Sequence, residues 1–329
     1  MTFWPNVIHY QLAIQNPQNW LSDSELRNGR PIWRRRGQLE MGKGGFAIIF
    51  PLICNQQKWG VRCFLYQDVN REERYQRISS YLNANRKTLP CMVHFEYFNQ
   101  GIIIENKPFP ILKMEWIEGI ELLSYIKKNL KNPHKFKDLA EKFRIMVNDL
   151  NKHHIAHGDL SHRNILIYNE QIKLIDYDGM FVPDLHDQNA SEVGQDNFQH
   201  PARKKESNLN HYFDHFSTWV IYLSLLALSI DPSLWSRYIV PKGEENLLFC
   251  SDDYNDPEHS EIFKTLEHFK DENVRKYARR LKFILSWPDI SQIPPLEFLI
   301  TGAGHVGSAT TSLPIQKYNP PLKKMWYQS

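Results

Sequence analysis

The stretch that decides the fold runs His157-Gly158-Asp159-Leu160-Ser161-His162-Arg163-Asn164-Ile165-Leu166-Ile167. An aspartate is followed five residues later by an asparagine, and an apolar segment typical of a strand comes directly after it. A second apolar segment lies in Lys173-Leu174-Ile175-Asp176-Tyr177-Asp178-Gly179 and ends at Asp176. About twelve residues separate Asn164 from Asp176, which is enough for a β-hairpin between them. We therefore expect Asp159, Asn164 and Asp176 to face one cleft.

A cluster of glycines lies about 115 residues before Asp159, in Gly42-Lys43-Gly44-Gly45-Phe46. Glycine lets backbone N–H groups approach phosphate oxygens closely, and a hairpin tip can fold over a phosphate chain. A glycine cluster on its own more often marks a simple turn. Its place before the apolar segment 48–50 favours a phosphate-binding loop, so we predict that Gly42, Gly44 and Gly45 bind phosphate.

The remaining sequence divides into a strand-rich half and a helix-rich half. The β-branched and aromatic residues predict strands over 46–50, 59–65, 92–98, 101–105 and 110–114, with one helix over 71–82. Apolar residues at helical spacing predict helices over 122–130, 139–152 and much of 214–286, and two short strands over 165–168 and 172–175. This order predicts an α+β fold of two lobes with a ligand between them. The predicted parts are an N-terminal extension (1–36), a small β-rich N-lobe (37–113), a larger helical C-lobe (114–300) and a C-terminal tail (301–329).

Together these features resemble the protein-kinase superfamily, and more narrowly the bacterial eukaryotic-type (Hanks-like) kinase-like proteins. The resemblance covers roughly residues 37–290. It implies an enzyme that binds ATP with Mg²⁺ or Mn²⁺ and transfers the γ-phosphoryl group to a protein hydroxyl of serine or threonine. The segment 157–167 corresponds to the catalytic loop of kinases. The implied roles are Asp159 as catalytic base, Asn164 and Asp176 as metal ligands, Met114 at the back of the adenine pocket, Glu115 and Ile117 as backbone partners of adenine, and Asp214 as a brace for the catalytic loop. Residues 177–201, which we call the activation segment, end in Gln199-His200-Pro201 where many kinases have Ala-Pro-Glu.

The sequence departs from the kinase pattern at the cation of the N-lobe. Kinases use a strand lysine to hold the α- and β-phosphates, and Arg62 stands in its place on the strand 59–65. We assign Arg62 to both the catalytic and the nucleotide-binding residues, although a guanidinium has a different shape from an ammonium. Lys43 and Lys58 are alternative cations.

Two acidic positions also depart from that pattern. A kinase helix carries a glutamate that pairs with the strand lysine. Here the helix 71–82 offers Glu72 and Glu73, but neither shares the apolar face marked by Ile78. The other departure is Asp178, which stands where protein kinases have glycine and small-molecule kinases often have an acidic residue.

These departures leave three functions open. A Ser/Thr protein kinase is the leading hypothesis, because Asp159, Asn164 and Asp176 are present and the activation segment is long enough to receive a peptide. A pseudokinase that acts as a nucleotide-binding scaffold is favoured by Arg62 and by the uncertain helix glutamate. A small-molecule kinase is favoured by Asp178, while the activation segment argues against it.

Composition limits the partners and the compartment. The net charge of +3 is too small to indicate nucleic acid or a membrane surface as a partner. The most apolar segment, 216–230, is shorter than the roughly 20 residues that span a bilayer. Four scattered cysteines and the lack of a signal-peptide pattern predict a cytoplasmic protein. The sequence does not indicate a particular protein substrate, and the resemblance implies a partner protein phosphatase.

Overall fold

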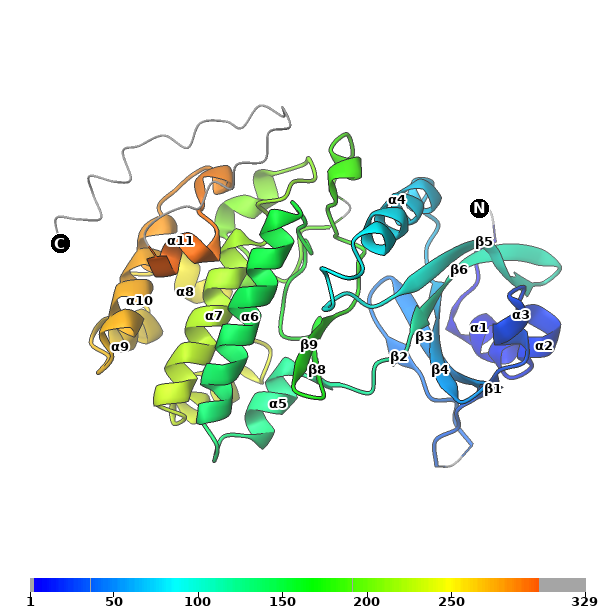
Figure 1. Cartoon of the computed structure of the whole chain (residues 1–329), viewed down its shortest axis with the longest axis horizontal. Coiled ribbons are helices and arrows are strands. Elements are labelled where there is room, and N and C mark those ends of the chain that lie inside the picture. Colours follow the sequence, from blue (N-terminus) through cyan, green and yellow to red (C-terminus); the bar gives the residue numbers. More distant parts are fainter. Residues whose placement is uncertain (1–2, 36, 191, 302–329) are drawn as a thin grey trace.

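The strand-rich half forms one antiparallel sheet with the spatial order β1-β3-β4-β6-β5, and β2 pairs with β3. The computed structural model describes residues 3–35, 37–190 and 192–301 (Figure 1). The strands of this sheet are β1 (Arg30–Pro31), β2 (Gly42–Lys43), β3 (Ala47–Cys54), β4 (Gln57–Phe64), β5 (Phe95–Ile104) and β6 (Lys107–Glu115).

Strand β5 is longer than predicted. The sequence pattern predicted separate strands over 92–98 and 101–105, but one strand carries an irregularity between Phe98 and Ile102. A Cβ atom on Gly101 would lie 2.2 Å from Cγ1 of Ile111 in β6, so only glycine lets the two strands approach this closely. The glycine that interrupts the apolar pattern therefore marks a bulge and not a turn.

The two faces of the sheet pack against different helices (Figure 1). Side chains alternate along β4, so that Val61 and Cys63 join the core under helices α1 (Val7–Ile14), α2 (Pro17–Trp20) and α3 (Ser24–Arg27). Phe64 joins the larger core on the other face, under α4 (Arg71–Ala84). Arg62 lies on this second face, which turns toward the helical lobe.

Polar contacts fasten the N-terminal helices to the sheet. Trp4 Nε1 and the Tyr10 hydroxyl both donate to the carbonyl oxygen of Phe64, at 2.8 and 2.7 Å. The buried Lys113 ammonium lies 2.7 Å from Glu25 Oε2 in α3. Because β1 also pairs with β3, this N-terminal segment shares the core of the sheet.

The helical lobe is built around α6 (His134–Lys152) and α7 (His215–Ile230), which pack side by side (Figure 1). The other elements are α5 (Leu122–Lys128), α8 (Ser251–Asn255), α9 (Glu261–Glu267), α10 (Glu272–Ile284), α11 (Leu296–Thr301), and a small sheet of β7 (Ile120–Glu121), β8 (Ile165–Tyr168) and β9 (Gln171–Leu174). This small sheet lies where the lobes meet, so the predicted two-lobed α+β fold is confirmed.

Helix α7 is apolar on nearly all sides. Nearly every side chain in it is accordingly buried. Within the described ranges, none of the helices combines the length and apolar character needed to cross a membrane. The predicted tail lies, from residue 302 onward, outside the described residues.

Candidate active site

A buried carboxylate at the start of α7 fixes the catalytic loop. Asp214 accepts hydrogen bonds from the backbone N–H of Gly158, at 2.9 Å, and from that of His157. Burial raises the pKa of Asp214, and the charge of His157 and the two N–H groups offset part of the rise. Asp214 thus lies where the kinase resemblance implied a brace for the loop.

Gly158 brings the catalytic loop against the segment that follows Asp176. Its φ of +81° lies in the left-handed region, and a Cβ atom there would lie 2.0 Å from the carbonyl oxygen of Gly179. Neither the backbone conformation nor the space admits a side chain at this position. A second contact joins the same two segments, because His157 Nε2 lies 2.8 Å from the carbonyl oxygen of Ile175.

Asp159 is oriented by donors on both sides of its carboxylate. Asn164 Nδ2 donates to Asp159 Oδ2 at 2.9 Å, and the backbone N–H of Gln195 donates to Oδ1 at 2.8 Å. Burial raises the pKa of Asp159 even though these donors act to lower it. A carboxylate with a raised pKa is a better proton acceptor at neutral pH. The geometry therefore suits Asp159 to general base catalysis.

Asp176 forms an ion pair with Arg62 across the two lobes. Its φ of +67° is rare outside glycine and is found at functional sites. Arg62 Nη1 lies 2.7 Å from Asp176 Oδ1, and the Arg62 side chain is only 9 % exposed whereas that of Asp176 is 43 % exposed. Burial opposes ionisation of Asp176, but Arg62 outweighs it and lowers the pKa of this carboxyl. An ionised and partly exposed carboxylate thus lies where the two lobes meet.

Asp178 gives Arg62 a second carboxylate. Arg62 Nη2 donates to Asp178 Oδ2 at 2.6 Å, and the Tyr75 hydroxyl of α4 donates to Asp178 Oδ1. Glu72 and Glu73, the glutamates that the sequence offered as partners, instead pair with neighbours on α4 itself. In the described structure, the counter-charge of Arg62 thus comes from the segment after β9 and not from a helix glutamate.

The glycine-rich segment forms a hairpin beside Arg62. Gly42 pairs with Ile49 of β3, and Ile49 pairs in turn with Arg62 of β4. Gly44 and Gly45 are exposed in the turn, where the Gly44 N–H donates to the carbonyl oxygen of the β3 residue Ala47 at 2.9 Å. All three predicted glycines therefore lie in the hairpin that borders the Arg62 position.

The alternative cations differ in their positions. Lys58 lies at the opposite end of β4 from Arg62 and pairs with Glu118, just after β6. The side chain of Lys43 lies outside what the structure describes. Arg62 is thus the cation found in contact with Asp176.

The predicted adenine-binding residues lie at the end of β6. Met114 is buried and pairs with both β4 and β5. The Glu115 N–H donates to the carbonyl oxygen of His94 at 2.9 Å, so this N–H is already engaged within the chain. Ile117 follows, half-buried against the larger core. A cavity of about 210 Å³ lined mainly by α4 and segment 89–95 touches Glu115 but none of the other predicted nucleotide-binding residues.

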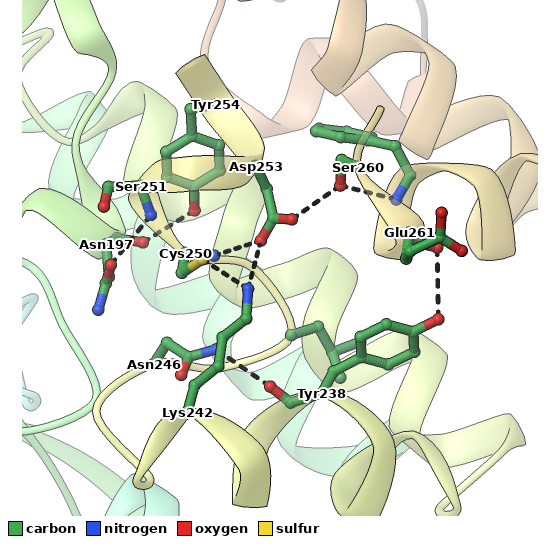
Figure 2. Close-up of polar contacts among 12 residues, drawn as sticks. Asn197, Tyr238, Lys242, Asn246, Cys250, Ser251, Asp253, Tyr254, Ser260 and Glu261 are labelled. Atoms are coloured by element: carbon green, nitrogen blue, oxygen red, sulfur yellow. Dashed lines mark hydrogen bonds and ion pairs between the residues drawn. The ribbon is translucent and has the colours of Figure 1, made fainter. Parts of the chain in front are cut away.

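The far end of the activation segment is bound to the helical lobe (Figure 2). Asn197 Oδ1 accepts the Ser251 N–H at 3.0 Å, and its carbonyl oxygen accepts the Tyr254 hydroxyl at 2.8 Å. The buried Asp253, also in α8, accepts the hydroxyl of Ser260 at 2.8 Å and so links α8 to the start of α9. The activation segment is thus anchored at Asn197 to α8, which is itself bonded to the start of α9.

Glu192 is a fourth carboxylate of the site that sequence reasoning missed. It comes from the activation segment, and its Oε1 lies 2.7 Å from the position that a Cβ on Gly179 would take. Burial, together with Asp178, Asp159 and Asp176, raises the pKa of Glu192 to about 8. At neutral pH its carboxyl is mostly protonated. The residues around it in the sequence carry no pattern that would distinguish it from a surface glutamate.

Asp176 and Asn164 fit a magnesium ion that is bound together with ATP. Magnesium prefers oxygen ligands and usually takes one or two carboxylates plus substrate phosphates. Oδ1 of Asp176 is buried against Arg62 Nη1, although the side chain as a whole is 43 % exposed, and the amide of Asn164 keeps its oxygen because Nδ2 bonds to Asp159. Among the described residues, no group of three or more His, Cys, Asp or Glu could hold a metal ion alone. The donor set thus suits an ion that phosphate oxygens help to bind.

Comparisons with known proteins agree with this geometry. The family RIO1, the RIO domain, matches residues 109–196, which run from β6 through the catalytic loop into the activation segment. Among solved structures, the kinase PK-1 of the Cydia pomonella granulovirus matches with a TM-score of 0.51 and 12% identity, over 82% of this chain and 94% of that chain. No curated protein matches the chain. The family match supports the predicted kinase resemblance over residues 109–196, and the structural match shows that the chain has a kinase-like fold.

Proposed function

We propose that this chain is an ATP-dependent phosphotransferase that transfers the γ-phosphoryl group to a serine or threonine hydroxyl of a protein. The observation that carries the proposal is that the catalytic loop is bonded to the segment of Asp176, through the Ile175 N–H and the Asn164 carbonyl, and that Asp176 in turn contacts Arg62 of the sheet. Asn164 lies 2.9 Å from Asp159, and Arg62 lies 2.7 Å from Asp176. A base, metal ligands and a cation for phosphate thus border one cleft.

In this proposal Asp159 accepts the proton of the attacking hydroxyl. The hydroxyl oxygen forms a bond to the γ-phosphorus, the bond from that phosphorus to the β–γ bridging oxygen breaks, and ADP leaves with the electron pair. Asn164 and the Gln195 N–H hold the base in position. Magnesium would neutralise phosphate charge when bound, and Asp176 and Asn164 are the residues that would hold it.

The activation segment supports a protein as the phosphate acceptor. One part of it touches the base through the Gln195 N–H, and another part is anchored to α8 through Asn197. An anchored segment beside the base offers a surface along which a peptide can lie. A partner protein phosphatase belongs to the same proposal, because it would reverse the modification.

A nucleotide-binding scaffold without turnover is the second candidate. Both oxygens of Asp159 accept hydrogen bonds, and Arg62 is engaged by Asp176 and Asp178. A scaffold would bind ATP with magnesium and become more stable to heat, but it would transfer no phosphate.

The test compares the wild type with Asp159→Asn for transfer of labelled γ-phosphate to the chain itself and to casein, with Mg²⁺ or Mn²⁺. Loss of the base is expected to lower transfer about 10²- to 10⁴-fold while ATP binding is kept. The thermal midpoint should fall slightly, because the asparagine side chain can accept only one of the two hydrogen bonds that Asp159 accepts. Asp187→Asn is the matched control, because Asp187 is an exposed carboxylate of the same segment that pairs with Arg77. Equal transfer by Asp159→Asn would contradict the proposal, and binding without transfer in the wild type would establish the scaffold.

A further inference from the structure

Helix α4 reaches the site through a tyrosine. Tyr75 is 2 % exposed and lies on the same face of α4 as Ile78. Its ring stacks on Tyr97 at 5.9 Å between centroids and meets Phe95 edge-on at 5.7 Å. Packing therefore fixes the hydroxyl, which donates to Asp178 Oδ1.

The Asp178 carboxylate joins three elements of the molecule. Its Oδ2 accepts from Arg62 of β4 at 2.6 Å, its Oδ1 accepts from Tyr75 of α4, and its backbone follows Asp176 by two residues. The side chain of Asp178 is 19 % exposed, so water screens these contacts only in part. Arg62 thus spans two carboxylates of one short segment, and only one of the two is linked to the helix.

Arg62 needs a partner that stays in place when nucleotide binds. A buried cation that loses its only counter-charge is strongly disfavoured. If Asp176 were that only partner, its engagement by a metal ion would leave Arg62 unpaired. Asp178 removes this conflict, because it can keep Arg62 Nη2 while Nη1 becomes available to a phosphate oxygen.

We propose that Asp178 is a positioning residue that takes over the task of the kinase helix glutamate, holding Arg62 toward the phosphates and tying it to α4 through Tyr75. The inference rests on the proposed function and deepens it. In kinases the carboxylate stands on the helix and a glycine follows the metal-binding aspartate. Here the carboxylate stands at the glycine position and the helix carries the tyrosine.

The first experiment measures ATP binding as a function of Mg²⁺ concentration, by calorimetry, and the kinetics of phosphate transfer for Asp178→Asn and Tyr75→Phe. Asp178→Asn is expected to lower kcat/KM about tenfold or more and to raise the Mg²⁺ concentration for half-maximal ATP binding, because Arg62 then competes with the ion for Asp176. Tyr75→Phe keeps the ring but loses the hydroxyl, so it should change both kcat/KM and the Mg²⁺ requirement in the same directions by smaller amounts. Asp187→Asn is again the control and should match the wild type.

The second experiment relocates the carboxylate. Asp178→Gly alone should lose activity, and Asp178→Gly combined with Tyr75→Glu should recover most of it, since the pair recreates a helix carboxylate opposite Arg62. Circular dichroism and thermal midpoints confirm that each variant folds. If Asp178 had a purely structural role, or if it were a metal ligand, moving the charge to α4 would not restore the activity.

The outcomes separate this inference from the proposed function. Wild type that binds ATP without transfer would overturn the proposed phosphotransfer, while the shift in Mg²⁺ dependence would still decide the role of Asp178. Asp178→Asn that matches the wild type in ATP binding at every Mg²⁺ concentration would overturn the inference alone. A folded double variant that behaves like Asp178→Gly would overturn it as well. Wild type that binds no ATP would overturn both.

Discussion

The two sides of the cleft are held by different kinds of bond. On the helical side, two backbone N–H groups of the catalytic loop donate hydrogen bonds to Asp214, and the backbone of Gly158 packs directly against Gly179. On the sheet side, the Arg62 guanidinium is held by the carboxylates of Asp176 and Asp178.

This difference explains why one side resembles kinases and the other departs from them. A backbone contact prescribes a residue type, since Gly158 has no room for a side chain and only an acceptor of the right length can serve at position 214. A charge can reach Arg62 from any element close enough to carry it. The sheet side can therefore be rebuilt with other residues while the charge pattern is kept.

Removing the brace on the helical side should have the largest effect. Asp214→Ala leaves two buried N–H groups without an acceptor, so the free energy of unfolding should fall by about 2–6 kcal/mol, at about 1–3 kcal/mol for each orphaned group. Phosphate transfer should be lost as well. Denaturant unfolding measures the stability, and Asp231→Ala at the exposed end of α7 is the control. A variant as stable as this control would show that the loop is held in another way.

Changing the cation on the sheet side should affect activity more than stability. Arg62→Lys keeps the charge but cannot span Asp176 and Asp178 with two nitrogens, so kcat/KM should fall about tenfold. Arg77→Lys on α4 is the matched control and should leave transfer unchanged, because Arg77 pairs with Glu73 and Asp187 away from the cleft. If Arg62→Lys were more active than the wild type, the arginine would be a less effective substitute for the usual lysine. The two carboxylates would then not be arranged to favour an arginine.

The smallest expected effect is a pH dependence that comes from Glu192. Its pKa is raised from 4.5 to about 8, chiefly by burial, next by Asp178, Asp159 and Asp176, with Arg62 acting in the opposite direction. The folded state favours the protonated carboxyl of Glu192. The stabilisation that comes from this raised pKa is therefore complete below about pH 4.5 and is lost as the pH rises through about 8.

Glu192→Gln removes this titration. The thermal midpoint of the wild type should therefore fall relative to that of Glu192→Gln as the pH rises from about 5 to about 8. Glu73→Gln, which alters an exposed carboxylate of α4, is the control. A wild type that gains stability relative to Glu192→Gln over this range would contradict the assignment.

The fold could be predicted because its periodic patterns are strong, but some boundaries could not. Helix α6 begins at His134, five residues before the predicted start, because Phe136 is the only apolar residue in that turn and is fully buried. Strand β5 was divided at Gly101, where a close approach to Ile111 and not a turn explains the glycine. Single residues of this kind take their meaning from partners distant in the sequence.

The site could be predicted in part for the same reason. Asp159, Asn164 and Asp176 occur in short motifs whose spacing is itself the signal, and the structure brings them together. Tyr75 and Glu192 have no such spacing, because each acts through contacts with residues more than ten positions away. The apolar face marked by Ile78 did point inward, yet the pattern could not reveal that a tyrosine on this face contacts Asp178.

A crystal structure of the wild type with Mg²⁺ and a non-hydrolysable ATP analogue tests the comparison most directly. The bonds from His157 and Gly158 to Asp214 should remain as they are, and Arg62 should exchange Asp176 for a phosphate oxygen while it keeps Asp178. A nucleotide bound elsewhere, or an Arg62 that stays on Asp176 and leaves Asp178, would contradict this account of the cleft.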